Sequence, residues 1–264
     1  MRHSSEELST AIESSFVDVF ATLCTASPGA ILRNEGDAII YSSGAPNSLL
    51  NGVLAARFDS RNMKKRTEEV LSFFEERHLP MTFFVGPCCC PPELDDHLRS
   101  LGLAAGWTRP GMAADLGIVR RMPLPVGLEI RPAEDIASFD MCARIFAEGF
   151  SSDGVMRQWL YDLAKGYGTS PTRRWFLGIL NKKPVATSVL VLDKGIAGIY
   201  SVATLQEARG RGVGTAITLE PMLEAKKRGF DFVVLQSSKM GLPVYEKIGF
   251  KEYCRIKAYS WSPG

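Results

Sequence analysis

The chain has 264 residues, 45% of them hydrophobic and 23% charged, which is long for one compact domain and sufficient for two of ordinary size. A formal net charge of +2 gives no electrostatic footprint for a polyanion, so composition does not suggest a nucleic-acid partner. The first residues are polar and acidic rather than signal-peptide-like, and no apolar run approaches the ~20 residues that span a bilayer. We therefore expect a cytoplasmic protein without a membrane partner.

The first half of the chain predicts a mixture of helices and strands. An amphipathic helix capped by Ser4 or Ser5 comes first, with acidic residues in its first turn. Alternating runs and turn residues then predict, in order, strands within 30–44 and 51–58, a helix at 62–79, a strand at 81–86, a helix at 91–103 and a strand at 104–116.

The second half repeats a similar order after the proline-rich stretch MPLPVG. Helices are expected at 134–150 and 153–168, followed by three antiparallel strands in 174–204. A helix from about Val213, a strand at 230–238, a helix at 242–250 and a strand at 252–261 complete the chain. The junction near residue 124 divides the chain into predicted units 1–123 and 124–264.

Two short segments suggest that these units arose by duplication. LRSLGL at 98–103 and YEKIGF at 245–250 share a pattern of helix residues, then glycine and an apolar residue, each after an apolar strand and a loop. The first unit enters its earlier helix through DSRNMKKR, which contains no glycine. We therefore interpret the first unit as a degenerate copy.

Six cysteines include the triplet Cys88, Cys89 and Cys90. Adjacent cysteines lack the two-residue separation of zinc sites, and the three histidines add no ligand spacing. Reduced, partly buried thiols are expected, and no metal.

The stretch EARGRGVGTAITLEP, residues 207–221, places glycines and arginines before a helix. Without Cβ atoms the backbone can approach a phosphate closely, and the free N–H groups of the first helical turn can bind it. The nest is expected from Gly210, Arg211, Gly212, Val213, Gly214 and Thr215. Arg209 and Arg211 add charge-assisted contacts. A nicotinamide site fits poorly, because the third glycine of its fingerprint is missing and the preceding strands are expected to be antiparallel.

These residues resemble the GNAT acyltransferases, the Gcn5-related family that binds acetyl-coenzyme A. Arg209, Gly212 and Gly214 match the family's loop, and PVYEKIGF is similar to its Tyr-x-x-x-Gly-Phe ending. The resemblance covers roughly residues 128–260. It implies a tandem α/β fold of two GNAT-like lobes, each a mixed and largely antiparallel sheet flanked by helices, with acetyl-CoA as co-substrate of the second lobe.

The resemblance also implies site residues. The backbone around Val202 and Thr204 would bond the pantetheine arm as an extra strand. Tyr245 would lie near the sulfur and act as a general acid for the leaving thiolate. Ser237 and Ser238 are candidates for hydrogen bonds to cofactor or substrate, or for capping alone.

The general base is missing from this pattern. Where relatives carry a glutamate, the strand before the loop has no carboxylate, and Gln236 stands in the next strand. Glu148 is the nearest candidate carboxylate on the substrate side, with a solvated acid as the alternative.

Two functions follow. One is an N-acyltransferase acting on a small-molecule or protein amine, with the first lobe shaping the acceptor site; the other is a non-catalytic acyl-CoA sensor. A monomer or a homodimer fits either.

Overall fold

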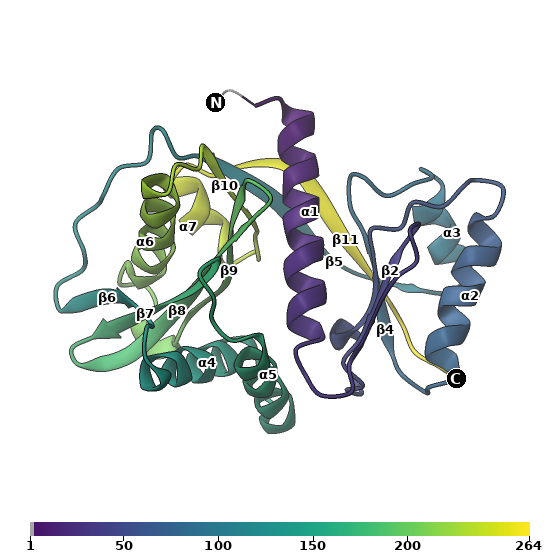
Figure 1. Cartoon of the computed structure of the whole chain (residues 1–264), viewed down its shortest axis with the longest axis horizontal. Helices are drawn as coiled ribbons and strands as arrows, with labels where there is room; N and C mark the ends of the chain where they lie inside the picture. Colours follow the sequence, from purple (N-terminus) through teal and green to yellow (C-terminus); the bar gives the residue numbers. More distant parts are fainter. Residues whose placement is uncertain (1–2) are drawn as a thin grey trace.

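A capping box starts the first helix. In the computed structural model, which describes residues 3–264, the Ser4 hydroxyl accepts from the Glu7 amide at 3.1 Å, and the Glu7 carboxylate accepts from the Ser4 amide at 2.7 Å. Helix α1 (Ser5–Cys24) then crosses the middle of the molecule (Figure 1). The predicted helix and its cap are confirmed.

The remaining elements of the first half also follow the prediction. They are β1 (Ile31–Asn34), β2 (Ile39–Ser42), β3 (Asn51–Leu54), α2 (Met63–Glu75), β4 (Met81–Val85), α3 (Leu94–Ser100) and β5 (Ala104–Asp115).

The second half contains one strand that the prediction missed, the edge strand β6 (Leu128–Pro132), which pairs antiparallel with β7. The other elements are those expected. They are α4 (Ile136–Phe150), α5 (Gly154–Tyr167), β7 (Arg173–Leu180), β8 (Lys183–Asp193), β9 (Ile196–Thr204), α6 (Val213–Lys227), β10 (Phe232–Gln236), α7 (Leu242–Lys247) and β11 (Lys251–Trp261).

All the strands form one sheet rather than one sheet per unit. Its order is β1-β2-β3-β4-β11-β5-β10-β9-β8-β7-β6. The two halves exchange their last strands: β5 pairs with β10 of the second half, and β11 pairs with β4 of the first. The pairs β3·β4 and β9·β10 are parallel, and the other neighbours are antiparallel. The mixed, largely antiparallel sheet is confirmed.

Helices cover both faces of the sheet. On β5, Ala113 packs with Leu8 and Ile12 of α1, whereas its neighbour Met112 packs with the core beneath α6 and α7. Because successive strand residues point to opposite faces, α1 and α6 lie on opposite sides. Helices α4 and α5 lie on the side of α1, and α2 and α3 lie on the side of α6 (Figure 1).

The segment 116–127 joins the halves and is fastened along α6. Lys226 Nζ donates to the Val119 carbonyl at 3.0 Å, and Arg121 pairs with Glu220 at 3.0 Å. The predicted boundary at residues 123 and 124 falls in this segment. These contacts hold the segment against α6.

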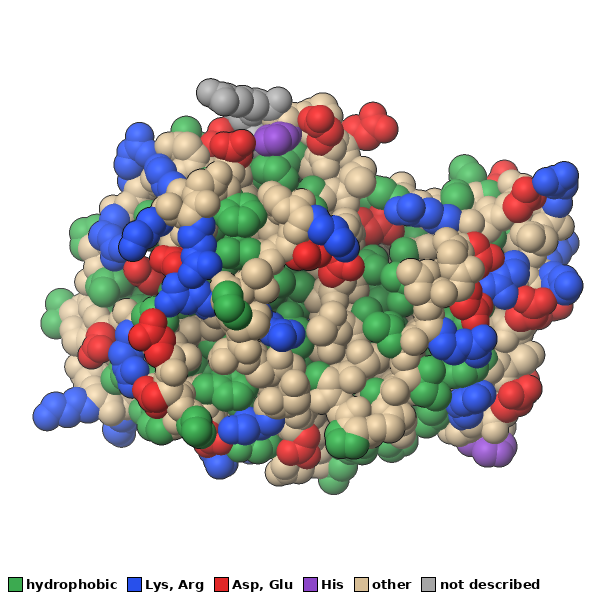
Figure 2. Space-filling view, in the orientation of Figure 1, with side chains coloured by type: hydrophobic (Ala, Val, Ile, Leu, Met, Phe, Trp, Pro, Cys, Tyr) green, Lys and Arg blue, Asp and Glu red, His purple; other side chains and the backbone are tan. Residues whose placement is uncertain are grey.

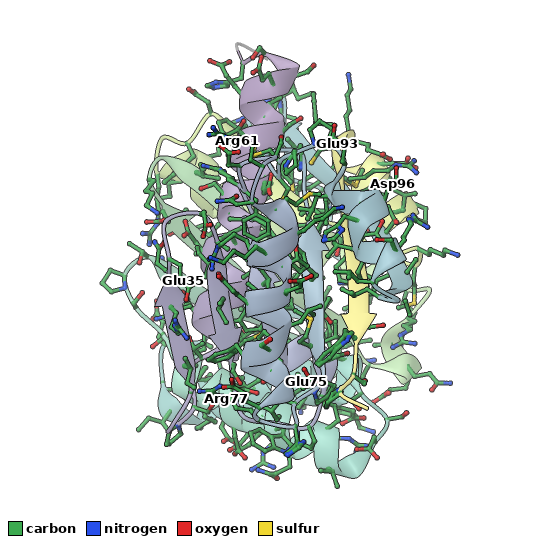
Figure 3. All side chains as sticks on the ribbon, turned by 90° about the vertical axis from the view of Figure 1, so that its right-hand side faces the viewer. Glu35, Arg61, Glu75, Arg77, Glu93 and Asp96 are labelled. Carbon is green, nitrogen blue, oxygen red and sulfur yellow. The ribbon has the colours of Figure 1, made fainter. Side chains whose placement is uncertain are left out.

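The outer surface of the first half is charged. Figure 3 shows Glu75 and Arg77 near one end of α2, and Glu93 and Asp96 at α3. All four are exposed. This side of α2 and α3 is an ordinary solvated surface.

Candidate functional site

A cleft of about 620 Å³ opens where β9 and β10 end. Its volume is in the range of small-molecule sites. Residues from four parts of the chain line it: Arg109; Gly149 and Phe150; Val202, Ala203, Thr204, Arg209, Gly210, Gly212, Gly214 and Thr215; and Ser238, Met240, Gly241, Pro243, Val244, Tyr245 and Lys247.

The cleft exists because two parallel strands separate. The register of β9 and β10 covers Ala197 with Val233 and Gly198 with Val234, and ends there. A register shift against β8 follows, with Ser201 at φ 50°. Such a bulge bends a strand. The later part of β9, including Val202 and Thr204, therefore turns its backbone toward the cleft instead of toward β10.

The glycine loop closes one end of this cleft. Gly210 has φ 71°, and Gly212, the N-cap of α6, has φ 78°, conformations that favour glycine. Gly214 lies in the first turn of α6, where a Cβ would meet nothing nearer than Thr204 Oγ1 at 3.7 Å. At this position glycine leaves space above the helix N-terminus, where a phosphate can approach.

Arg209, Arg211 and Val213 differ in which of their groups can contact a ligand in the cleft. The Arg209 guanidinium donates to the Thr204 carbonyl at 3.0 Å and ties the loop to β9. Arg211 is exposed and lies outside the cleft lining given above, and the side chain of Val213 is buried in the core. Val213 can therefore contribute its backbone N–H. Figure 2 shows Lys and Arg side chains gathered on the α6 side of the molecule, a favourable field for phosphates.

Tyr245 lies in the wall of the cleft on α7. It is 9% exposed, and its ring packs against Phe250 at 5.8 Å between centroids. Burial raises the pKa of the Tyr245 phenol to about 12, and the nearby Arg109 charge opposes that rise. The phenol is therefore protonated across the neutral range.

The serines that follow β10 divide their roles. Ser237 is buried and its hydroxyl donates to the Ser238 carbonyl at 2.8 Å. Ser238 accepts from the Gly241 amide at 3.1 Å, which caps the turn leading into α7, and it also lines the cleft.

No carboxylate is among the residues that line this cleft in the described chain. Glu148 is exposed on α4, beside the lining residues Gly149 and Phe150. Gln236 donates from Nε2 to the Ile12 carbonyl at 3.2 Å, which serves packing of α1.

The sequence did not reveal several of the lining residues, namely Gly149, Phe150, Ala203, Met240, Gly241, Pro243, Val244, Lys247 and Arg109. Of these, Arg109 lies farthest from the others along the chain. It comes from β5 in the first half, and a single arginine in a strand carries no local pattern that marks a site.

The first half has a counterpart of the strand separation, but α1 fills it. The pairing of β3 and β4 covers Gly52 with Thr82 and Val53 with Phe83, and Ala55 follows at φ 53°. There the buried Glu13 carboxylate accepts from the Cys88 amide at 2.5 Å. The residues around Glu13 leave no room for a water molecule.

Two cysteines of the triplet, Cys88 and Cys89, hydrogen-bond to the Glu13 carboxylate. All six cysteines are free, and burial raises the pKa of the Cys88 and Cys89 thiols, with Glu13 adding to the rise. Within residues 3–264 no cluster of three or more His, Cys, Asp or Glu could hold a metal ion. In the same residues, no helix is long and apolar enough to cross a membrane.

Comparison with solved structures shows the fold across almost the whole chain. A GCN5-related N-acetyltransferase from Kribbella flavida superposes with a TM-score of 0.72 at 18% identity, covering 96% of each chain. A tandem GNAT protein from the clavulanic acid biosynthesis pathway gives 0.64 at 14% identity, covering 94% of this chain and 88% of its own. A GCN5-related N-acetyltransferase from Sphaerobacter thermophilus gives 0.62 at 17% identity, covering 86% and 78%.

A search of the curated proteins finds no match to the chain. Residues 137–250, which run from α4 through α7 and contain the glycine loop and Tyr245, match the model of the acetyltransferase (GNAT) family. The part of the chain that holds the cleft is thus similar to the acetyltransferase domains of the GNAT family, whose members move an acetyl group from acetyl-CoA to an amine.

Proposed function

We propose that the chain binds one acetyl-CoA in the cleft between β9 and β10 and transfers its acetyl group to an amine. The observation that carries the proposal is the separation of these strands with the glycine loop at its end. The pyrophosphate would lie on the N–H groups of residues 210–215, and the pantetheine arm along Val202 and Thr204. The thioester would then lie near Tyr245.

The reaction needs two events at the thioester carbonyl. A neutral amine attacks the carbonyl carbon and forms the C–N bond, and collapse of the tetrahedral intermediate breaks the C–S bond. The Tyr245 phenol can donate a hydrogen bond to the sulfur as negative charge develops on it. The attacking nitrogen gives up its proton to water.

Without a carboxylate among the described lining residues, the cleft needs another way to keep the acceptor amine neutral. The charged side chains at the cleft are Arg109, Arg209 and Lys247, all cationic. A nearby cation disfavours an ammonium group, so this surrounding promotes the neutral, nucleophilic form of an acceptor amine.

The first half would support the site without binding acetyl-CoA itself. Its strand separation is filled by Glu13 and its neighbours, and its helix α2 begins without a side-chain cap or a preceding glycine loop. We expect calorimetry to give one acetyl-CoA per chain. The six free cysteines fit a reducing, cytoplasmic location.

Thiol release from acetyl-CoA in the presence of a panel of amines tests the function. We expect CoA to appear in step with acetylated amine, identified by mass. The lack of a lining carboxylate is the one observation that favours a sensor. Stoichiometric acetyl-CoA binding without turnover on any amine, small molecule or peptide, would establish the sensor and reject transfer.

A further inference from the structure

Arg109 presents an unsatisfied cation to the cleft. It lies on β5 two residues before Gly111, which pairs with Gln236 at the end of β10. Arg109 therefore lies beyond the end of β10, where Ser238 and the turn into α7 begin. The Ser237 amide donates to the Pro110 carbonyl at 2.9 Å and holds β5 against this turn. The position of Arg109 is thus fixed by the sheet.

Its guanidinium has no acidic partner. Among residues 3–264 no ion pair or hydrogen bond joins Arg109 to a carboxylate, although Arg66 and Arg174 are each paired with two or more acids. Arg109 instead stacks on Trp107, with Cζ at 4.1 Å from the ring centroid. Burial lowers the pKa of Arg109, which reflects the cost of keeping this charge away from water.

Acetyl-CoA in the position proposed above would not contact the Arg109 guanidinium. The glycine loop and Arg209 follow β9, whereas Arg109 lies on β5, two strands away. At the usual strand spacing this separates their backbones by roughly 10 Å. Arg109 is instead near Tyr245, whose pKa its charge lowers, and therefore near the acyl end of the coenzyme.

The same region has an apolar rim. Phe150 and Met240 line the cleft and are 51% and 66% exposed. An acceptor that enters here meets two apolar side chains at the mouth and one guanidinium inside.

We propose that Arg109 binds a carboxylate of the acceptor, so that the acceptor is an amino acid or another amine that carries a carboxylate. The guanidinium fork matches a carboxylate in two parallel hydrogen bonds, and the Trp107 ring holds the fork in one plane. Binding the carboxylate fixes the distance from the amine to the thioester. The inference rests on the proposed acyl transfer for its chemistry, but not for its binding step.

The experiment compares acids with their amides. Amino acids and ω-amino acids are assayed for thiol release beside the matched carboxamides, with wild type, Arg109→Gln and Arg109→Lys. Arg255→Gln is the control, because Arg255 on the adjoining strand β11 is already paired with Glu252 at 2.7 Å.

For wild type we expect the acids to react and their amides to react at least tenfold less well. In Arg109→Gln we expect KM for the acids to rise 10–100-fold with kcat changed far less, the usual effect of losing a charged hydrogen bond. Arg109→Lys, which keeps the positive charge, should raise KM for the acids less than Arg109→Gln does.

Binding separates this inference from the proposed function. The same acids and amides are titrated by calorimetry into CoA-saturated wild type and Arg109→Gln, and acetyl-CoA is titrated into both free proteins. Acids that bind only when Arg109 is present support the carboxylate site even if no acetyl transfer is found, in which case only the proposed function fails. Amides that bind and react as well as the acids overturn the inference while transfer stands. Loss of acetyl-CoA affinity in Arg109→Gln, with acceptor discrimination intact, also overturns it.

Discussion

At the scale of single residues, a substitution at Gly214 should affect coenzyme binding without affecting folding. A side chain there fits the free protein, since its Cβ would meet Thr204 Oγ1 at 3.7 Å, an ordinary contact. An acidic residue in the first turn of α6 also suits the helix dipole. The same side chain would occupy the proposed phosphate position and repel it.

We therefore expect acetyl-CoA to raise the melting temperature of wild type, by about 2.7 kcal/mol of stabilisation at 100 times Kd. Gly214→Asp should melt at the wild-type temperature without ligand and show no shift with acetyl-CoA. Gly214→Ala, which adds bulk but no charge, should retain part of the shift. Differential scanning fluorimetry measures all three. A full shift in Gly214→Asp would place the phosphates elsewhere.

Tyr245→Phe tests the sulfur contact. The ring would still pack against Phe250, so acetyl-CoA affinity should hardly change. Loss of the phenol should lower kcat by something like 10²-fold, the usual scale for a positioned acid. Steady-state thiol release and calorimetry on both proteins measure the two quantities. An unchanged kcat would reduce Tyr245 to a packing residue.

The pKa of Tyr245 predicts the alkaline limb of that activity. Because burial raises the pKa to about 12, the folded protein holds this proton above the unfolded pKa of about 10. Its contribution to stability is present below about pH 10 and lost as pH rises toward 12. We expect kcat to stay flat from about pH 9 to about pH 10.5, whereas an ordinary phenol would by then be mostly ionised. A half-maximal point near pH 10 in wild type would contradict this.

At the scale of an element, helix α6 contains Pro221 and remains helical to Lys227. Proline removes the backbone N–H that would bond to the Ile217 carbonyl four residues earlier. The structure supplies another donor, since the buried Ser188 hydroxyl of β8 donates to that carbonyl at 2.7 Å. A proline within a helical stretch marks the missing bond in the sequence, but the replacement donor cannot be found there because it is 29 residues away in the chain.

Ser188→Ala should therefore cost about 1–3 kcal/mol, because it leaves the Ile217 carbonyl buried without a partner. In a Pro221→Ala background, the restored backbone N–H of residue 221 can donate to the Ile217 carbonyl. The loss of unfolding free energy caused by Ser188→Ala should therefore be smaller. Urea denaturation of the four proteins gives the coupling. Additive effects of the two substitutions would show that the hydroxyl and the proline are unrelated.

At the scale of the whole molecule, the sequence predicted what depends on neighbouring residues. Capping, alternation and turn glycines predicted α1, the central strands and the glycine loop before α6. Thr204 and Tyr245 were named as site residues only through the family resemblance, and both line the cleft together with Gly212. Pairing between distant segments was not predictable in this way. The exchange of β5 and β11 depends on which strand edges meet, and Arg109 reaches the cleft through that exchange. The missed strand β6 is short and lies at the sheet edge. Edge strands are partly exposed, so their sequences alternate less clearly between hydrophobic and polar residues.

The exchange also predicts that the two units do not fold alone. Residues 124–264 lack β5, which leaves β10 and β11 without the strand between them. We expect this fragment to show no cooperative urea transition, and to regain one when mixed with residues 1–123. Circular dichroism measures both. A fragment that folds and binds acetyl-CoA alone would show that the exchange is dispensable.

The exchanged strands also set the order of events during synthesis. When β5 has been made, its partners β10 and β11 do not yet exist, and β4 likewise waits for β11. Until the last strand is complete, β4 and β5 present unpaired edges, which are templates for association between nascent chains. Folding of either half therefore waits until β11 has been made. We expect nascent chains that have not yet reached β11 to aggregate more readily than the folded protein at the same concentration.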